Sequence, residues 1–79
     1  MDNYEFDADL YLTIKKNIKK YRLEKGITAA KLAECIDVSH EFIRQIESNN
    51  EKYNFSVRTL YKISVVLGVS LDKLIEKTD

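Results

Sequence analysis

Apolar residues recur at helical spacing through most of the chain and mark five segments. Leu10, Ile14, Ile18 and Tyr21 are spaced by four, four and three residues, which predicts one amphipathic helix from about Leu10. Gly26 then supplies the left-handed residue that commonly ends a helix. Four further segments show shorter versions of the pattern, and their expected inward residues are Leu32, Ala33 and Ile36; Ile43 and Ile46; Val57, Leu60, Ile63 or Ser64, and Leu67; and Leu71, Leu74 and Ile75.

A serine or threonine, both preferred N-cap residues, stands directly before each of the last four segments. With no proline and only two glycines in 79 residues, the composition favours helices over a turn-rich sheet. The sequence therefore predicts a compact all-α fold of five short helices. Their expected positions are from about Leu10 to Gly26, Ala29 to Ile36, after Ser39 to about Glu47 or Ser48, after Ser56 to Gly68, and after Ser70, with Thr28, Ser39, Ser56 and Ser70 as N-caps.

The stretch from Thr28 to Glu47 contains the second and third of these helices, joined by a tight turn at Asp37 and Val38. A pair of short helices joined in this way is typical of a helix-turn-helix, which places its second helix in the DNA major groove. Ile43 and Ile46 are expected to point inward. The face left towards the outside then carries His40, Glu41, Phe42, Arg44 and Gln45.

Length and composition allow one domain with one small core. Hydrophobic residues make up 44% and charged residues 33% of the chain, which is ordinary for a folded globular domain. Long apolar runs are absent, so we expect no membrane association and no signal peptide. The single cysteine, Cys35, cannot form an internal disulfide, which is compatible with a cytoplasmic location.

Thirteen basic and thirteen acidic residues give zero net charge, which is not the basic balance expected of a nucleic-acid binder. The charges are unevenly placed, however. Residues 1–9 carry four acids and no base, whereas residues 15–25 carry six bases and one acid. We expect residues 1–9 to form an extended or frayed acidic N-terminal tail and residues 10–79 to form the domain. Tyr4 and Phe6 are apolar enough to dock; we favour a loosely packed tail, and the alternative is a dimer contact. The bases of the first helix are expected to form mainly a solvated face.

The sequence shows no arrangement that indicates an enzyme. His40 and Cys35 have no neighbours at metal-ligand spacing, and no glycine-rich phosphate loop or nucleophile–base pair is visible. We therefore expect no catalytic residue, no metal, no cofactor and no small-molecule ligand.

Several short motifs occur in order and together resemble the Cro/C1-type helix-turn-helix family, the phage-repressor-like or XRE-like domains. The resemblance covers about sixty residues, from Ile14 to Ile75, and implies a lambda-repressor-like DNA-binding domain with its helix-turn-helix at the second and third helices. The residues that carry it are Ile18, Tyr21-Arg22, Gly26-Ile27-Thr28, Leu32-Ala33, Val38-Ser39, Ile43, Ile46-Glu47, Leu67-Gly68-Val69-Ser70-Leu71-Asp72 and Leu74.

The resemblance also implies roles for individual residues. Arg22 and Glu47 would form a structural ion pair between the first helix and the end of the third. Base reading would fall to His40, Glu41, Phe42, Arg44 and Gln45, and backbone phosphates would meet Thr28, Ala29, Ser39, Ser48, Asn49, Asn50 and Lys52.

Four departures from the family pattern bear on these roles. Ala29 replaces a frequent glutamine, which removes a side-chain phosphate contact, and Asp37 replaces a turn glycine. The loop after Glu47 is about two residues longer than usual and lacks its usual proline. Glu41 places a negative charge near phosphates, which costs affinity unless it pairs with a base or with Arg44.

The leading hypothesis is a sequence-specific transcriptional regulator, a repressor, that binds double-stranded DNA as a homodimer. The last helix, with Leu71, Leu74 and Ile75, and the tail aromatics are candidate dimer contacts, although core packing is expected to account for most of the apolar residues of that helix. The alternative is a protein-interaction module such as an antitoxin, which the neutral charge, Glu41 and Phe42 favour.

Overall fold

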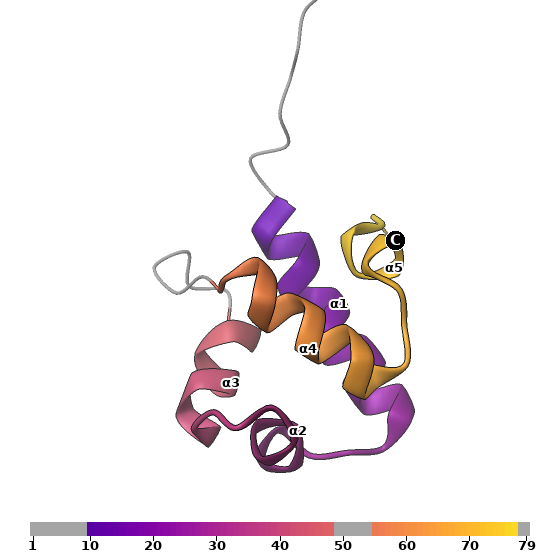
Figure 1. Ribbon diagram of the computed structural model, residues 1–79. Helices are drawn as coiled ribbons and strands as arrows, with labels where there is room; N and C mark the ends of the chain where they lie inside the picture. Colours follow the sequence, from indigo (N-terminus) through magenta and orange to yellow (C-terminus); the bar gives the residue numbers. More distant parts are fainter. Residues whose placement is uncertain (1–9, 49–54, 78–79) are drawn as a thin grey trace, which may run out of the picture.

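The computed structural model describes residues 10–48 and 55–77, and it contains five helices and no strand within these ranges. They are α1 (Leu10–Lys25), α2 (Ala29–Ile36), α3 (His40–Glu47), α4 (Val57–Leu67) and α5 (Leu71–Ile75). In Figure 1, α4 lies across α1, while α2 and α3 lie together beside them and α5 lies against α1. The expected all-α fold of five helices is confirmed. The expectations for residues 1–9, and for Asn49, Asn50 and Lys52, lie outside the described residues.

Helix ends coincide with the capping signals in the sequence. Thr28, Ser39, Ser56 and Ser70 have extended backbones, and each side chain accepts a hydrogen bond from the backbone N–H three residues on. These bonds satisfy amides that the first helical turn leaves unpaired. Left-handed residues end three helices: Gly26, Asp37 and Gly68, with φ of 77°, 61° and 69°. Asp37 therefore takes the conformation of the glycine it replaces, which aspartate tolerates better than most residues.

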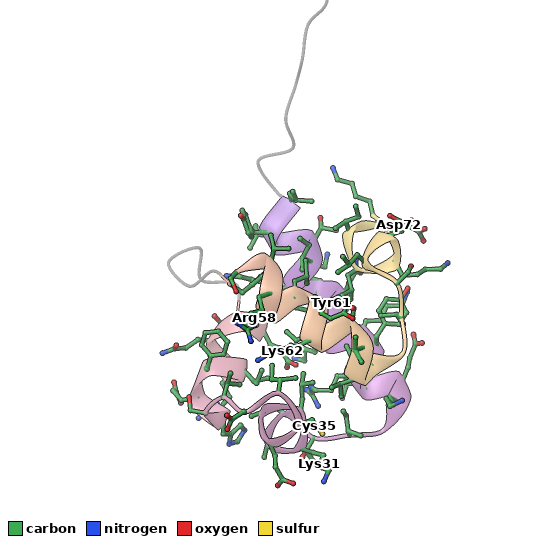
Figure 2. The ribbon with its side chains drawn as sticks, in the orientation of Figure 1. Lys31, Cys35, Arg58, Tyr61, Lys62 and Asp72 are labelled. Carbon is green, nitrogen blue, oxygen red and sulfur yellow. The ribbon has the colours of Figure 1, made fainter. Side chains whose placement is uncertain are left out.

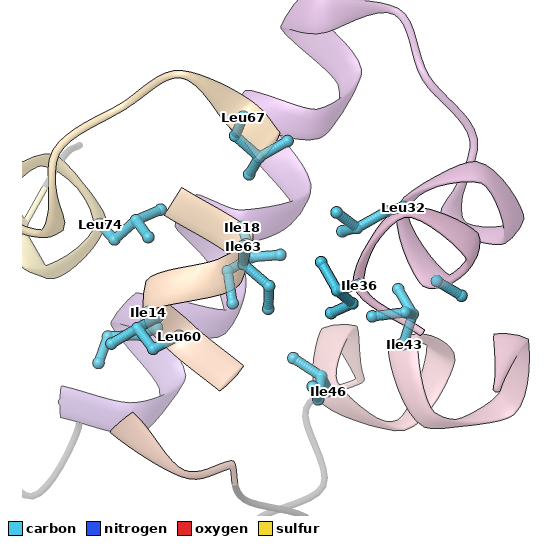
Figure 3. Close-up of a cluster of buried hydrophobic side chains, with 11 residues drawn as sticks. Ile14, Ile18, Leu32, Ile36, Ile43, Ile46, Leu60, Ile63, Leu67 and Leu74 are labelled. Atoms are coloured by element: carbon cyan, nitrogen blue, oxygen red, sulfur yellow. The ribbon is translucent and has the colours of Figure 1, made fainter. Parts of the chain in front are cut away.

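The core lies between α2 and α3 on one side and α1, α4 and α5 on the other (Figure 3). Ile18, Ile43, Ile46, Ile63 and Leu74 are fully buried. Ala33 is also buried, and its small side chain allows α3 to approach α2 closely. The core consists of Ile14, Ile18, Leu32, Ala33, Ile36, Ile43, Ile46, Leu60, Ile63, Leu67 and Leu74.

Several burial predictions were wrong. Val57, expected inward, is 78% exposed because it stands in the first turn of α4, beyond the edge of the core. On α5 only Leu74 is buried, and Leu71 and Ile75 are exposed, so core packing does not account for most of its apolar residues. Lys15, expected on a solvated face, is buried. It lies beside Ile14 on the edge of the inward face, where a long aliphatic stem can pack.

A partly buried ion pair fixes α3 against α1. The Nε of Arg22 donates to Glu47 Oε2 at 2.6 Å, and its second guanidinium nitrogen donates to Glu47 Oε1 at 3.0 Å. The remaining nitrogen donates to the carbonyl oxygen of Ile27 at 2.8 Å. One planar guanidinium thus joins α1, the loop before α2 and the end of α3, with a bidentate geometry that lysine cannot reproduce.

A buried asparagine holds α5 in place. The side-chain amide of Asn17 on α1 donates to the carbonyl oxygens of Leu74 at 2.7 Å and Glu76 at 2.8 Å, with a longer contact to that of Lys73 at 3.4 Å. These carbonyls belong to the end of a five-residue helix, which leaves them without helical partners. Asn17 therefore acts as a C-terminal cap supplied by another helix.

We predict that Glu47→Ala destabilises the domain by about 3 kcal/mol, because the guanidinium of Arg22 is left buried without its counter-charge. In a domain of this size, such a loss lowers Tm by more than about 10 °C. The matched control is Glu34→Ala, which removes the partner of Lys31, 3.2 Å away, from an exposed ion pair. Thermal unfolding followed by circular dichroism checks this, and equal shifts for the two variants would contradict it.

We predict that Asn17→Ala costs about 1–3 kcal/mol of stability, because it strands buried carbonyl oxygens. Asn17→Asp should cost more at neutral pH, since a carboxylate of the same shape accepts where the site requires a donor. Urea unfolding and hydrogen exchange of the α5 amides measure both effects, with exposed Lys16→Ala as control. An Asp variant as stable as wild type would show that these hydrogen bonds do not hold α5.

Candidate nucleic-acid interface

The α2–α3 pair is built by local hydrogen bonds on either side of its turn. Asp37 donates its backbone N–H towards the carbonyl oxygen of Glu34 at 3.3 Å, and Val38 donates to that of Ala33 at 3.0 Å. Ser39 then starts α3 by accepting from the N–H of Phe42 at 3.0 Å. Val38 and the apolar residues of α3 pack on the core, so the turn sets which face of α3 remains outside.

The outward face of α3 carries most of the residues expected to read bases. His40, Glu41 and Arg44 are exposed, and Gln45 is half-buried. Arg44 and Glu41 lie three residues apart and form an ion pair with 3.5 Å between guanidinium nitrogen and carboxylate oxygen. The structure therefore brings these four polar side chains onto one short helix, with a cation and an anion already in contact.

Phe42 does not lie on the outward face of α3, where it was expected. Its side chain is half-buried and packs against the core. The reason is helical geometry: Phe42 precedes buried Ile46 by four residues and so lies on the edge of the inward face. Its main contribution is to hold α3 on the core.

Four of the residues expected at phosphates lie within the described part of the chain, and they divide into three groups. The hydroxyls of Thr28 and Ser39 accept capping hydrogen bonds, which leaves each hydroxyl proton to donate elsewhere. Ala29 is half-buried and packs against the core, so it offers its backbone only. Ser48 donates its hydroxyl proton back to the carbonyl oxygen of Gln45 at 2.7 Å.

The lysine and the arginine of the α2–α3 pair each contact a carboxylate. Lys31 pairs with Glu34, and Arg44 pairs with Glu41. The hydrogen bond from Lys31 to Glu34, with the attraction of the same carboxylate, raises the pKa of Lys31. Both pairs are exposed, so they hold little free energy and are readily exchanged for other partners. The cations of this surface are therefore balanced by neighbouring carboxylates, and the surface is rich in hydrogen-bonding groups.

The side chains of this surface suit recognition through hydrogen bonds. Arg44 supplies a planar fork of donors, Gln45 a donor and an acceptor, and Glu41 an acceptor. Among the described residues, no group of His, Cys, Asp and Glu side chains has an arrangement that could hold a metal ion. None of the helices in the same ranges has the length and apolar character that a membrane span requires.

The sequence analysis did not predict two features of the structure, the cap supplied by Asn17 and the exposed apolar face of α4. The cap supplied by Asn17 had a signal, since Asn17 follows Ile14 by three residues and precedes Tyr21 by four, and a polar residue on an inward face usually has a buried partner. The exposed apolar face of α4 had a weaker signal. The segment from Val57 to Leu67 has more apolar residues than one inward face can hold.

Comparisons with known proteins give three closely consistent matches. The chain is 39% identical over 66 residues to the HTH-type transcriptional regulator SinR of Bacillus licheniformis, covering 84% of this chain and 59% of that protein. It therefore spans less than two thirds of the length of this curated relative. The N-terminal DNA binding domain of SinR from Bacillus subtilis superposes with a TM-score of 0.73 at 38% identity, covering 84% of this chain and 94% of that one.

A third match is the solved structure of the master regulator for biofilm formation SinR in complex with DNA. Its TM-score is 0.72 at 40% identity, over 80% of this chain and 98% of that one. The family model described as Helix-turn-helix matches residues 18–74, which include α2, α3 and α4, the second half of α1 and all but the last residue of α5. The chain therefore belongs to the helix-turn-helix family, in its Cro/C1-type branch.

Proposed function

We propose that this chain is a sequence-specific DNA-binding transcriptional regulator, a repressor, that places α3 in the major groove of double-stranded DNA. The observation that carries the proposal is the likeness, at 40% identity, to a SinR structure solved with DNA. The exposed face of α3 supports it independently, because His40, Glu41 and Arg44 are polar, accessible and presented by a helix anchored through Ile43 and Ile46.

Base contacts follow from the side chains on this face. Arg44 can donate two hydrogen bonds to guanine, Gln45 can pair with adenine, and Glu41 can accept from the amino group of cytosine. His40, in the first turn of α3, can reach the same groove. Phe42 contributes mainly by supporting the helix, with at most the edge of its ring available to a thymine methyl group.

Phosphate contacts would orient the domain without reading sequence. The N-termini of α2 and α3 present unpaired backbone N–H groups and the positive ends of two helix dipoles, which suit phosphate oxygens. The hydroxyls of Thr28 and Ser39 stand at these two ends. Asn49, Asn50 and Lys52 would extend this contact along the backbone, and Ser48 would join them by exchanging its hydrogen bond to Gln45 for one to a phosphate.

The protein is proposed to act as a homodimer on a pseudo-palindromic site with half-sites about 34 Å apart. Leu71 and Ile75 on α5 support this, because they are 37% and 44% exposed on a helix whose remaining apolar residue, Leu74, fills the core. A second copy would remove both side chains from water.

We predict that Arg44→Ala weakens binding to DNA from the region upstream of the protein's own gene by roughly 5- to 150-fold, the value of one bidentate base contact. Gln45→Ala should act in the same direction. Fluorescence anisotropy at several salt concentrations measures the effect, and wild-type affinity should fall steeply with salt. Lys16→Ala on α1, an exposed lysine outside the proposed interfaces, is the control for the loss of one surface cation. If wild-type protein showed no salt-sensitive binding to this DNA, a module that binds only protein would replace the proposal.

We predict that the double variant Leu71→Ser, Ile75→Ser abolishes cooperative binding to a two-half-site DNA, while its affinity for an isolated half-site stays within about twofold of wild type. The physical reason is the loss of apolar burial between copies. Sedimentation equilibrium and gel-shift titrations check this. Leu23→Ser, which removes an exposed leucine from α1, is the control. Unchanged cooperativity in the double variant would place the dimer contact elsewhere.

A further inference from the structure

A continuous row of apolar side chains is exposed on α4. Val57, Tyr61 and Val65 follow one another at intervals of four residues, so they lie on one face of the helix, and they are 78%, 58% and 60% exposed. We call these three residues the α4 stripe. Single exposed apolar residues are ordinary, whereas a contiguous apolar patch on a folded domain marks a contact with something else.

The α4 stripe borders a groove between α4 and the end of α2. Tyr61 and Val65 form part of one wall, and Cys35 and Asp37 part of the other. The groove is open and has a volume of about 330 Å³, at the lower end of the range for binding clefts, so it has room for one aromatic ring. Figure 2 shows Tyr61 and Lys62 on α4, with Cys35 on α2 next to them.

Basic side chains border the same face. Arg58 and Lys62 are also four residues apart, each directly after a residue of the α4 stripe, and α4 contains no acidic residue. A second copy docked through this face would bring the arginine and lysine of one copy against those of the other, which is unfavourable. Because Asp37 stands on the opposite wall of the groove, an aromatic ring fits the groove itself, and acidic side chains fit beside Arg58 and Lys62.

The first nine residues of the chain have this composition. They contain Tyr4 and Phe6, four carboxylates and no base. The start of α1 also lies beside the start of α4, because the rings of Tyr11 and Phe55 are in edge-to-face contact with 5.5 Å between their centroids. Nine extended residues reach about 30 Å, whereas the α4 stripe rises about 12 Å along its helix.

We propose that the α4 stripe and its groove are the docking surface for the chain's own N-terminal segment, residues 1–9. The rings of Tyr4 and Phe6 lie on the apolar stripe and groove, and the acidic side chains face Arg58 and Lys62. Covalent attachment at Leu10 raises the effective concentration of the segment to the millimolar range or above, so that a weak contact is well populated. The proposal does not depend on DNA binding, and it is tested without DNA.

The test compares amide NMR spectra of the full chain with those of the full-chain variant Tyr4→Ser, Phe6→Ser. We expect the largest chemical-shift differences outside the substituted segment at Arg58, Tyr61, Lys62 and Val65. Raising the salt concentration should move the same wild-type signals part of the way towards the variant, because salt screens the charge contacts. Leu23→Ser, which removes an exposed apolar side chain from α1, is the matched control and should leave the α4 signals unchanged.

The reciprocal variant, Tyr61→Ser with Val65→Ser, changes only exposed side chains and should shift the amide signals of residues 2–9. A spin label at Asn3→Cys, in a Cys35→Ser background, should broaden the amides of the α4 stripe in the wild-type segment and not in the Tyr4→Ser, Phe6→Ser segment. Shift differences confined to residues next to the substitutions would overturn the proposal. Broadening seen only between labelled and unlabelled chains would assign the face to a second copy and would overturn it equally.

Discussion

The guanidinium of Arg22 is the contact on which the position of α3 depends. It is bound by both carboxylate oxygens of Glu47 at the end of α3 and by the carbonyl oxygen of Ile27 before α2. The apolar contacts of Ile43 and Ile46 hold α3 on the core but are tolerant of small rotations. The ion pair is directional, and a bidentate pair admits little rotation. Specificity of orientation, more than net stability, is the contribution expected of such a pair.

The fold could be predicted largely because its signals are local. Four Ser or Thr caps and left-handed residues at Gly26, Asp37 and Gly68 define most helix ends through contacts within a few residues of each other. Which face of each helix is buried is decided by partners distant in sequence, and there prediction was less complete. Val57, Leu71 and Ile75 satisfy a helical period but are left exposed by the other helices that the structure describes. Lys15 and Asn17 show the converse, polar residues that tertiary contacts bury.

In the candidate interface, too, positions set by local sequence were predicted better than positions set by tertiary packing. The outward positions of His40, Glu41 and Arg44 result from helical period alone, since Ile43 and Ile46 define the inward side. Phe42, on the boundary between the two faces, was not predicted correctly, because a large ring on a boundary packs wherever the core leaves room. Pairing with Arg44 reduces the cost of a carboxylate near phosphates, and Glu41 forms that pair in the structure.

The pairing of Lys31 and Arg44 with carboxylates affects how such a surface would discriminate among DNA sequences. A domain whose cations are unpaired gains most of its affinity from phosphates, which are the same at every site. Here Arg44 and Lys31 already contact carboxylates, so part of what each gains from a phosphate is offset by the loss of its carboxylate. A guanine that accepts two hydrogen bonds from Arg44, beside a cytosine amino group that donates to Glu41, would satisfy both members of the pair at once. Glu41 would therefore lower affinity for DNA in general while raising the difference between the correct site and the others.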